Sequence, residues 1–232
     1  MKEKLFYSDT FHLTPGDFDQ YLRLKPYSIF NLFQEVASQA STINLDRELQ
    51  DRSWRLLRTK YIILKQPGLS EKVFVETRPL PAHKSEFRRE FIISSTDHNV
   101  LVKGSSIWCI DDVAEELLSR DEILNDEDQD LNQEIVNLKP DVQFPIFKHQ
   151  VRASDLDFFL HLNVARYGEI IFDAMNLQKN EFIKQIQINF LNPVGVGEVI
   201  SISKANFENK YFLIGTVPDK IVFRAFVKTN YD

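Results

Sequence analysis

The chain has 232 residues, enough for one large or two small domains with a sizeable core. Its 43% hydrophobic and 27% charged residues are typical of a globular protein and exclude a disordered or fibrous one. The net charge of −6 argues against a general nucleic-acid binder, because such a protein presents a basic surface. The single cysteine, Cys109, excludes an intramolecular disulfide and a multi-cysteine metal site.

The sequence shows no sign of export or of membrane insertion. Its first residues lack the long apolar core of a signal peptide, and no apolar run approaches the ~20 residues that cross a bilayer. We therefore expect a soluble, cytoplasmic protein with no nucleic-acid partner and no membrane insertion. A homodimer remains open.

The first half of the sequence predicts one strand, one long helix and four further strands. Residues 6–14 alternate as in a strand, and apolar residues at helical spacing over 26–43 predict a helix, with Pro26 in its first turn. Turn signals separate the next β-type runs, which are 54–64, 72–78, 86–95 and 100–111. One helix before consecutive strands indicates an α+β fold with an antiparallel sheet over the helix.

The second half repeats this order after an acidic tract. A strand is expected at 147–153 and a helix from Asn163 to Met175; the strands that follow are expected at 183–190, 199–205, 212–217 and 221–229. We therefore expect an N-terminal domain at 1–115, an acidic linker at 116–142 and a C-terminal domain at 143–232.

A short motif supports duplication of one unit. Segments 17–24 and 155–162 share the pattern Asp-x-Asp-x-x-Leu-x-Leu, each after a strand and before a helix. Arg23 stands at the position of His161, so any chemistry differs between the halves. Asn163 is placed to cap the second helix, whose free N–H groups and positive dipole end suit an anion or a developing oxyanion. The alternative is that Asp155, Asp157 and His161 are ordinary loop residues.

At this point the sequence resembles the acyl-ACP thioesterase family over nearly its whole length. The resemblance rests on Gln34–Ala37, Trp54–Arg58, Pro67, Val75–Pro79, Ser105–Asp111, Ser154–Asp157, His161, Asn163 and Tyr167. Members of this family carry two hotdog domains in tandem, each a long helix wrapped by an antiparallel sheet. The resemblance therefore implies this fold and the hydrolysis of fatty acyl-ACP to free fatty acid.

The resemblance also implies which residues act. The catalytic Asp and His of the family fall on Asp157 and His161, its Asn on Phe159, and its Glu near Pro193. Asp157 would act as base or orient water, and His161 would stabilise the oxyanion or carry the proton, with donors at Asn163. Glu169 and Asn192 are candidate substitutes for the missing groups. Because Phe159 replaces the Asn, a non-hydrolytic acyl-binding or regulatory protein stays open, as does a thioesterase acting on acyl-CoA.

Substrate and partner residues follow from the same resemblance. It places an acyl tunnel in the first domain, with candidate lining residues Ile29, Phe33, Val36, Trp54 and Leu56, and Phe159 as a further contact. Acyl carrier protein is acidic, so a locally basic surface is expected at Arg55, Arg58, Arg88 and Arg89. We expect no metal and no cofactor, because the histidines lack metal-ligand spacing and no Gly-rich phosphate loop is present. Cys109 is expected to be a buried structural thiol.

Overall fold

The structure is a computed structural model that describes residues 6–44, 54–81, 86–110 and 144–231. In the first half its elements are β1 (Tyr7–His12), α1 (Pro26–Asn44), β2 (Trp54–Ile63), β3 (Lys72–Pro79), β4 (Phe87–Ser95) and β5 (Val100–Ile110). In the second half they are β6 (Phe147–Gln150), α5 (Val164–Met175), β7 (Glu181–Phe190), β8 (Val199–Phe207), β9 (Lys210–Val217) and β10 (Lys220–Tyr231).

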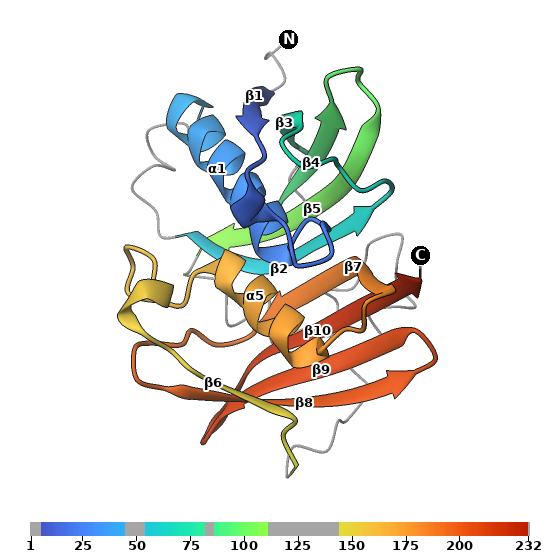
Figure 1. The fold of residues 1–232 in the computed structure, drawn as a ribbon. Coiled ribbons are helices and arrows are strands. Elements are labelled where there is room, and N and C mark those ends of the chain that lie inside the picture. Colours follow the sequence, from blue (N-terminus) through green and yellow to red (C-terminus); the bar gives the residue numbers. More distant parts are fainter. Residues whose placement is uncertain (1–5, 45–53, 82–85, 111–143, 232) are drawn as a thin grey trace.

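The described strands form one antiparallel ten-stranded sheet in the order β1-β3-β4-β5-β2-β7-β10-β9-β8-β6. The second half of this order repeats the first in reverse, and the two halves meet where β2 pairs with β7. Both helices lie on the same face of the sheet (Figure 1). The predicted α+β fold of two tandem hotdog domains is therefore confirmed. The proposed linker at 116–142 lies outside the described residues.

The core lies between the helices and the sheet, and the two helices touch at a glycine. A Cβ atom on Gly168 of α5 would lie 2.8 Å from the Phe30 ring of α1, so only glycine permits this close approach. Phe30 in turn packs against Tyr61 of β2, with ring centroids 5.2 Å apart. The halves thus share one continuous core as well as one sheet.

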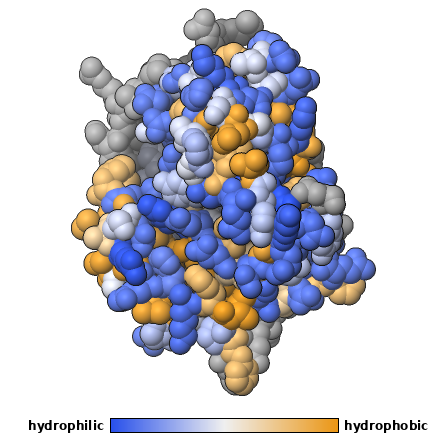
Figure 2. All heavy atoms as spheres, in the orientation of Figure 1, coloured by the Kyte–Doolittle hydropathy of each residue, from blue (hydrophilic) through white to orange (hydrophobic). Residues whose placement is uncertain are grey.

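The predicted strand at 147–153 ends earlier than expected. Residues Ala153–Asp155 form a short 3-10 turn, η3, because the Asp155 carboxylate accepts the backbone N–H of Arg152 at 2.8 Å. None of the helices in the described part of the chain is long and apolar enough to cross a membrane. On the face that carries the helices the surface is mostly hydrophilic, with apolar side chains along the left edge, in the upper centre and toward the lower edge (Figure 2).

Candidate active site

The carboxylate of Asp157 closes the loop between η3 and α5. Its Oδ1 accepts the backbone N–H of Phe159 at 2.9 Å and that of His161 at 3.2 Å. The backbone N–H of Asp157 donates to the carbonyl of His161 at 2.8 Å, and Leu160 takes a φ of 64°. A leucine with left-handed backbone angles is uncommon and unfavourable. The hydrogen bonds to Asp157 compensate for this conformation and hold the turn in place. Asp157 thereby builds the loop that presents His161.

The equivalent loop of the first half has the same bonds. Asp19 Oδ1 accepts the N–H of Tyr21 at 2.8 Å and that of Arg23 at 2.9 Å, and Leu22 takes a φ of 61°. The backbone N–H of Asp19 donates to the carbonyl of Arg23 at 2.9 Å. The sequence repeat is thus a repeat of loop architecture, and the second Asp of the motif holds this turn in both halves.

The two loops differ at the residue that follows the left-handed leucine. Arg23 is only 8% exposed and donates to the carbonyls of Lys179 at 2.7 Å and Glu181 at 2.6 Å, in the second half of the chain. His161 is exposed, and its imidazole makes no hydrogen bond within the described residues. The first loop therefore joins the halves, whereas the second leaves an imidazole open to solvent.

Phe159 and Asn163 flank His161 in different ways. Phe159 is exposed, with its ring 4.1 Å from that of Phe158. Asn163 caps α5 as predicted, because its Oδ1 accepts the N–H of Ala165 at 2.8 Å. The side-chain oxygen of Asn163 is thus engaged in the cap. A ligand at this position would meet the N-terminus of the helix rather than that oxygen.

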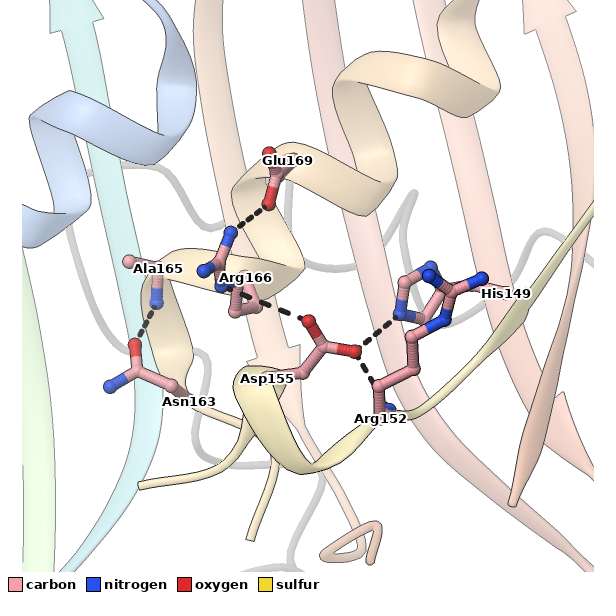
Figure 3. A network of polar contacts seen from close by, with 7 residues as sticks. All are labelled: His149, Arg152, Asp155, Asn163, Ala165, Arg166 and Glu169. Carbon is pink, nitrogen blue, oxygen red and sulfur yellow. Dashed lines mark hydrogen bonds and ion pairs between the residues drawn. The ribbon is translucent and has the colours of Figure 1, made fainter. Parts of the chain in front are cut away.

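Asp155, rather than Asp157, anchors a network of side-chain polar contacts beside the loop (Figure 3). Its Oδ2 lies 3.1 Å from His149 Nε2, and its Oδ1 lies 3.9 Å from Arg166 Nε. Arg166 also binds Glu169 at 2.6 Å, which raises the pKa of the guanidinium. Glu169 is therefore engaged in an ion pair. Local sequence patterns do not predict this network, because His149 and Arg166 lie on different elements.

The chain's C-terminal half matches a known family. Residues 138–222 match the family model of the acyl-ACP thioesterase C-terminal domain. This part of the chain is therefore similar to the C-terminal domain of acyl-ACP thioesterases. No curated protein sequence matches the chain.

Solved structures show the same fold over the full length. An acyl-ACP thioesterase from Bacteroides thetaiotaomicron is 17% identical with a TM-score of 0.81, over 97% of this chain and 98% of that one. The 12:0-ACP thioesterase from Umbellularia californica is 14% identical with a TM-score of 0.79, over 100% of both chains. At these identities the likeness concerns the fold, which for both neighbours is that of an acyl-ACP thioesterase.

The segment expected to carry the thioesterase Glu lies beside the loop. The N–H of Leu162 donates to the carbonyl of Val194 at 2.8 Å, which places Pro193 close to the loop. Asn192, the candidate substitute, instead donates to the carbonyl of Ile221 at 2.7 Å. Among the described residues of this segment, neither Pro193 nor Asn192 thus supplies a third catalytic carboxylate or amide to the loop.

Tyr167 is a neighbour of the loop that sequence reasoning used only as part of the resemblance. Its ring packs edge-on against Phe190 and Phe223, with centroids 5.0 Å and 5.5 Å away. Burial raises the pKa of Tyr167, and the carboxylates of Glu198 and Asp157 raise it further. Tyr167 is therefore a neutral hydroxyl group near both carboxylates. The sequence signal that could have identified Tyr167 is its position one turn after the start of the helix that follows the loop.

The candidate tunnel residues fall into two groups. Ile29, Phe33 and Val36 are buried in the core, and Phe33 stacks on Phe91 with centroids 4.4 Å apart. Trp54 and Leu56 are half-buried, and Trp54 meets Phe87 edge to face at 4.7 Å. The first three side chains thus already have packing partners, and an acyl chain among them would require those partners to move.

The predicted basic surface needs one correction. Arg58 is only 2% exposed, so its side chain is not available to a docking protein. The three others are partly exposed. Arg55 donates to the carbonyl of Leu191 at 3.2 Å, Arg88 pairs with Glu86 at 3.2 Å, and Arg89 donates to Thr77 Oγ1 at 3.3 Å, its pKa lowered by burial.

Metal-ligating residues do not gather in the described part of the chain, where no three His, Cys, Asp or Glu side chains are placed to share an ion. Cys109 is a buried thiol, as predicted.

Proposed function

We propose that this chain hydrolyses the thioester of fatty acyl-ACP and releases the free fatty acid. The observation that carries the proposal is the loop before α5, where Asp157 fixes the backbone of an exposed His161 next to the N-terminus of a helix. The match of residues 138–222 to the acyl-ACP thioesterase C-terminal domain and the likeness of the whole fold to two ACP thioesterases support it.

The loop offers the groups that hydrolysis requires. Asp157 uses Oδ1 for the loop, and its Oδ2 makes no hydrogen bond within the described residues, so it is available to orient a water molecule. Water attacks the thioester carbonyl and loses a proton to His161, which then protonates the leaving thiolate. At the start of α5 the N–H groups of Ala165 and Arg166 already donate to Asn163. The N–H of Val164 and the positive end of the helix dipole therefore stabilise the oxyanion.

A second candidate function rests on Phe159. A phenyl ring neither positions water nor donates to an oxyanion, and this ring stands where the family has Asn. A protein that binds acyl thioesters without cleaving them is therefore the alternative. Losing one such donor lowers the rate by roughly 10²–10³, so a slow enzyme is also consistent with this residue.

Single-turnover hydrolysis of a panel of acyl-ACPs and acyl-CoAs tests the proposal. His161→Ala should abolish turnover and Asp157→Asn should reduce it strongly. Asp19→Asn is the matched control, since Asp19 makes the same two backbone bonds in the first loop. Equal activity of the Asp157→Asn and Asp19→Asn proteins would reduce Asp157 to a loop-building role. No turnover by the wild type, together with tight acyl-ACP binding, would favour the second candidate.

A further inference from the structure

The loop that carries His161 is a small hairpin, defined here as residues 155–163, whose base closes at Asp155. The carbonyl of Asp155 accepts the N–H of Asn163 at 2.9 Å, and Leu156 pairs with Leu162 in an antiparallel bridge. His161 stands on the returning arm, one residue before this bridge. Its orientation therefore depends on how the base of the hairpin is held against the rest of the molecule.

The matching hairpin of the first half, residues 17–25, is held through Arg23. Its base closes in the same way, since the N–H of Lys25 donates to the carbonyl of Asp17 at 2.9 Å. Within the described residues the Asp17 carboxylate bonds only to Thr14, accepting its N–H at 2.7 Å and its hydroxyl at 2.8 Å. The two bonds of Arg23 to carbonyls of the second half fix this hairpin in place.

The second hairpin is anchored at its base instead. The imidazole of His161 makes no hydrogen bond to any described residue, whereas the Asp155 carboxylate reaches two other elements. Its Oδ2 lies 3.1 Å from Nε2 of His149 on the edge strand β6, and its Oδ1 lies 3.9 Å from Nε of Arg166 on α5. The His149 nitrogen thus takes the place that the hydroxyl of Thr14 has in the first half.

Arg166 extends this anchor to the other half of the molecule. Its guanidinium binds Glu169 at 2.6 Å and lies 4.9 Å from the centre of the Tyr27 ring on α1. Figure 3 shows the Asp155 carboxylate between His149 and Arg166. Asp155 is only 8% exposed, so solvent screens these contacts less than it screens a surface ion pair.

We propose that Asp155 is a positioning residue for His161, because its carboxylate fixes the hairpin against β6 and α5 through His149 and Arg166. This inference rests on the proposed function, which gives His161 its role in hydrolysis. Asp155 acts through the hairpin and does not itself touch the substrate. Without the anchor His161 would be present but misplaced, and a misplacement of about 1 Å lowers a rate by up to roughly 10²-fold.

Asp155→Asn tests this inference, since it removes the charge and keeps the size of the side chain. Exchange of the backbone amides of residues 157–162 with deuterated water should become about tenfold faster. The kcat for acyl-ACP should fall about tenfold or more at unchanged KM. Asp17→Asn is the matched control in the first hairpin, and it should leave both the exchange of residues 157–162 and kcat at their wild-type values.

A second variant covers the case in which Asp155→Asn lowers the melting temperature. The His149→Ala/Arg166→Ala protein removes both anchoring partners and leaves the bond from the Arg152 N–H to Asp155, so the turn η3 stays intact. It should show the same faster exchange and the same loss of kcat. Thermal melting of all variants separates these effects from a loss of fold.

The two readouts also separate this inference from the proposed function. Unchanged exchange over residues 157–162 would overturn the inference, whether or not the wild type turns over. Faster exchange with a wild-type kcat, or a rise in KM at constant kcat, would overturn it as well, because His161 would then not depend on the anchor. An inactive wild type would refute hydrolysis alone, and faster exchange would still support the anchoring of the hairpin by Asp155.

Discussion

Arg23 of the first loop donates to the backbone carbonyl of Glu181, the first residue of β7, at 2.6 Å across the junction of the two halves. Its guanidinium also lies 5.6 Å from the ring of Phe182. Arg23→Ala should lower the free energy of unfolding by about 2 kcal/mol, because the buried carbonyl of Glu181 and the partly buried carbonyl of Lys179 lose a charged donor. Urea denaturation measures this change. His161→Ala, the same change in the exposed position of the second loop, should leave stability within about 0.5 kcal/mol of wild type.

Gly168 is the contact point of the two helices, and a methyl group there should force them apart. Gly168→Ala should destabilise the protein by about 1–3 kcal/mol despite the better helix propensity of alanine. The clash is with the Phe30 ring, so Phe30→Leu should restore part of the stability in the double variant. Chemical denaturation of the four proteins of this cycle measures the coupling. Additive effects would show that the contact is not limiting.

Asp173 predicts a pH-dependent change in stability. Burial and the neighbouring Glu169 raise its pKa, His149 opposes this, and the residue lies near the C-terminus of α5, where a negative charge is unfavourable. A raised native pKa means that folding favours the protonated form, so this stability is present at low pH and lost as pH rises through the native pKa.

Asp173→Asn keeps the neutral form at every pH. At pH 7 it should raise stability by a few tenths of a kcal/mol, because the group is partly solvated and the dipole term is screened, and at about pH 3 it should have no effect. Thermal melting at both pH values measures this difference. Asp97→Asn, in the exposed β4–β5 turn, is the control for a general charge effect. A gain of equal size at both pH values would contradict the assigned cause.

The basic residues predict a salt-dependent partner surface. Charge reversal at the partly exposed Arg88 should weaken binding of acyl carrier protein several-fold at low salt, and high salt should remove the difference. Arg58→Glu should instead destabilise the protein, since that side chain is buried. Binding measured at two ionic strengths, with melting curves alongside, separates these effects. Equal binding by the wild type and the Arg88 variant at low salt would show that Arg88 is not part of the docking surface for acyl carrier protein.

Sequence periodicity predicted the helices and strands closely, because apolar spacing and turn residues act locally. The stripe over 26–43 became α1, and Asn163 became the cap of α5. The contacts that distinguish the two loops were not predictable in this way. Arg23 and Glu181 are separated by 158 residues, and only the fold brings them together.

In the candidate site, too, sequence position was predictable and the contacts between residues were not. The position of His161 in the chain was readable, whereas the use of Asp157 Oδ1 by the backbone was not, since a carboxylate at this spacing serves equally well as a catalytic group and as a loop-building one. Arg58 illustrates the reverse error, because a charged side chain that was expected at the surface is buried in the structure.

The pairing of β2 with β7 makes each half an incomplete sheet. If either half were produced alone, the strand that normally lies at the centre would become a bare edge with a full row of unpaired N–H and C=O groups. Two copies of that half would cover this edge by pairing with each other about a two-fold axis, rebuilding a ten-stranded sheet from identical subunits. The present chain thus has the architecture of a symmetric dimer joined into one polypeptide, in which one loop was free to become a clamp while the other kept an exposed histidine.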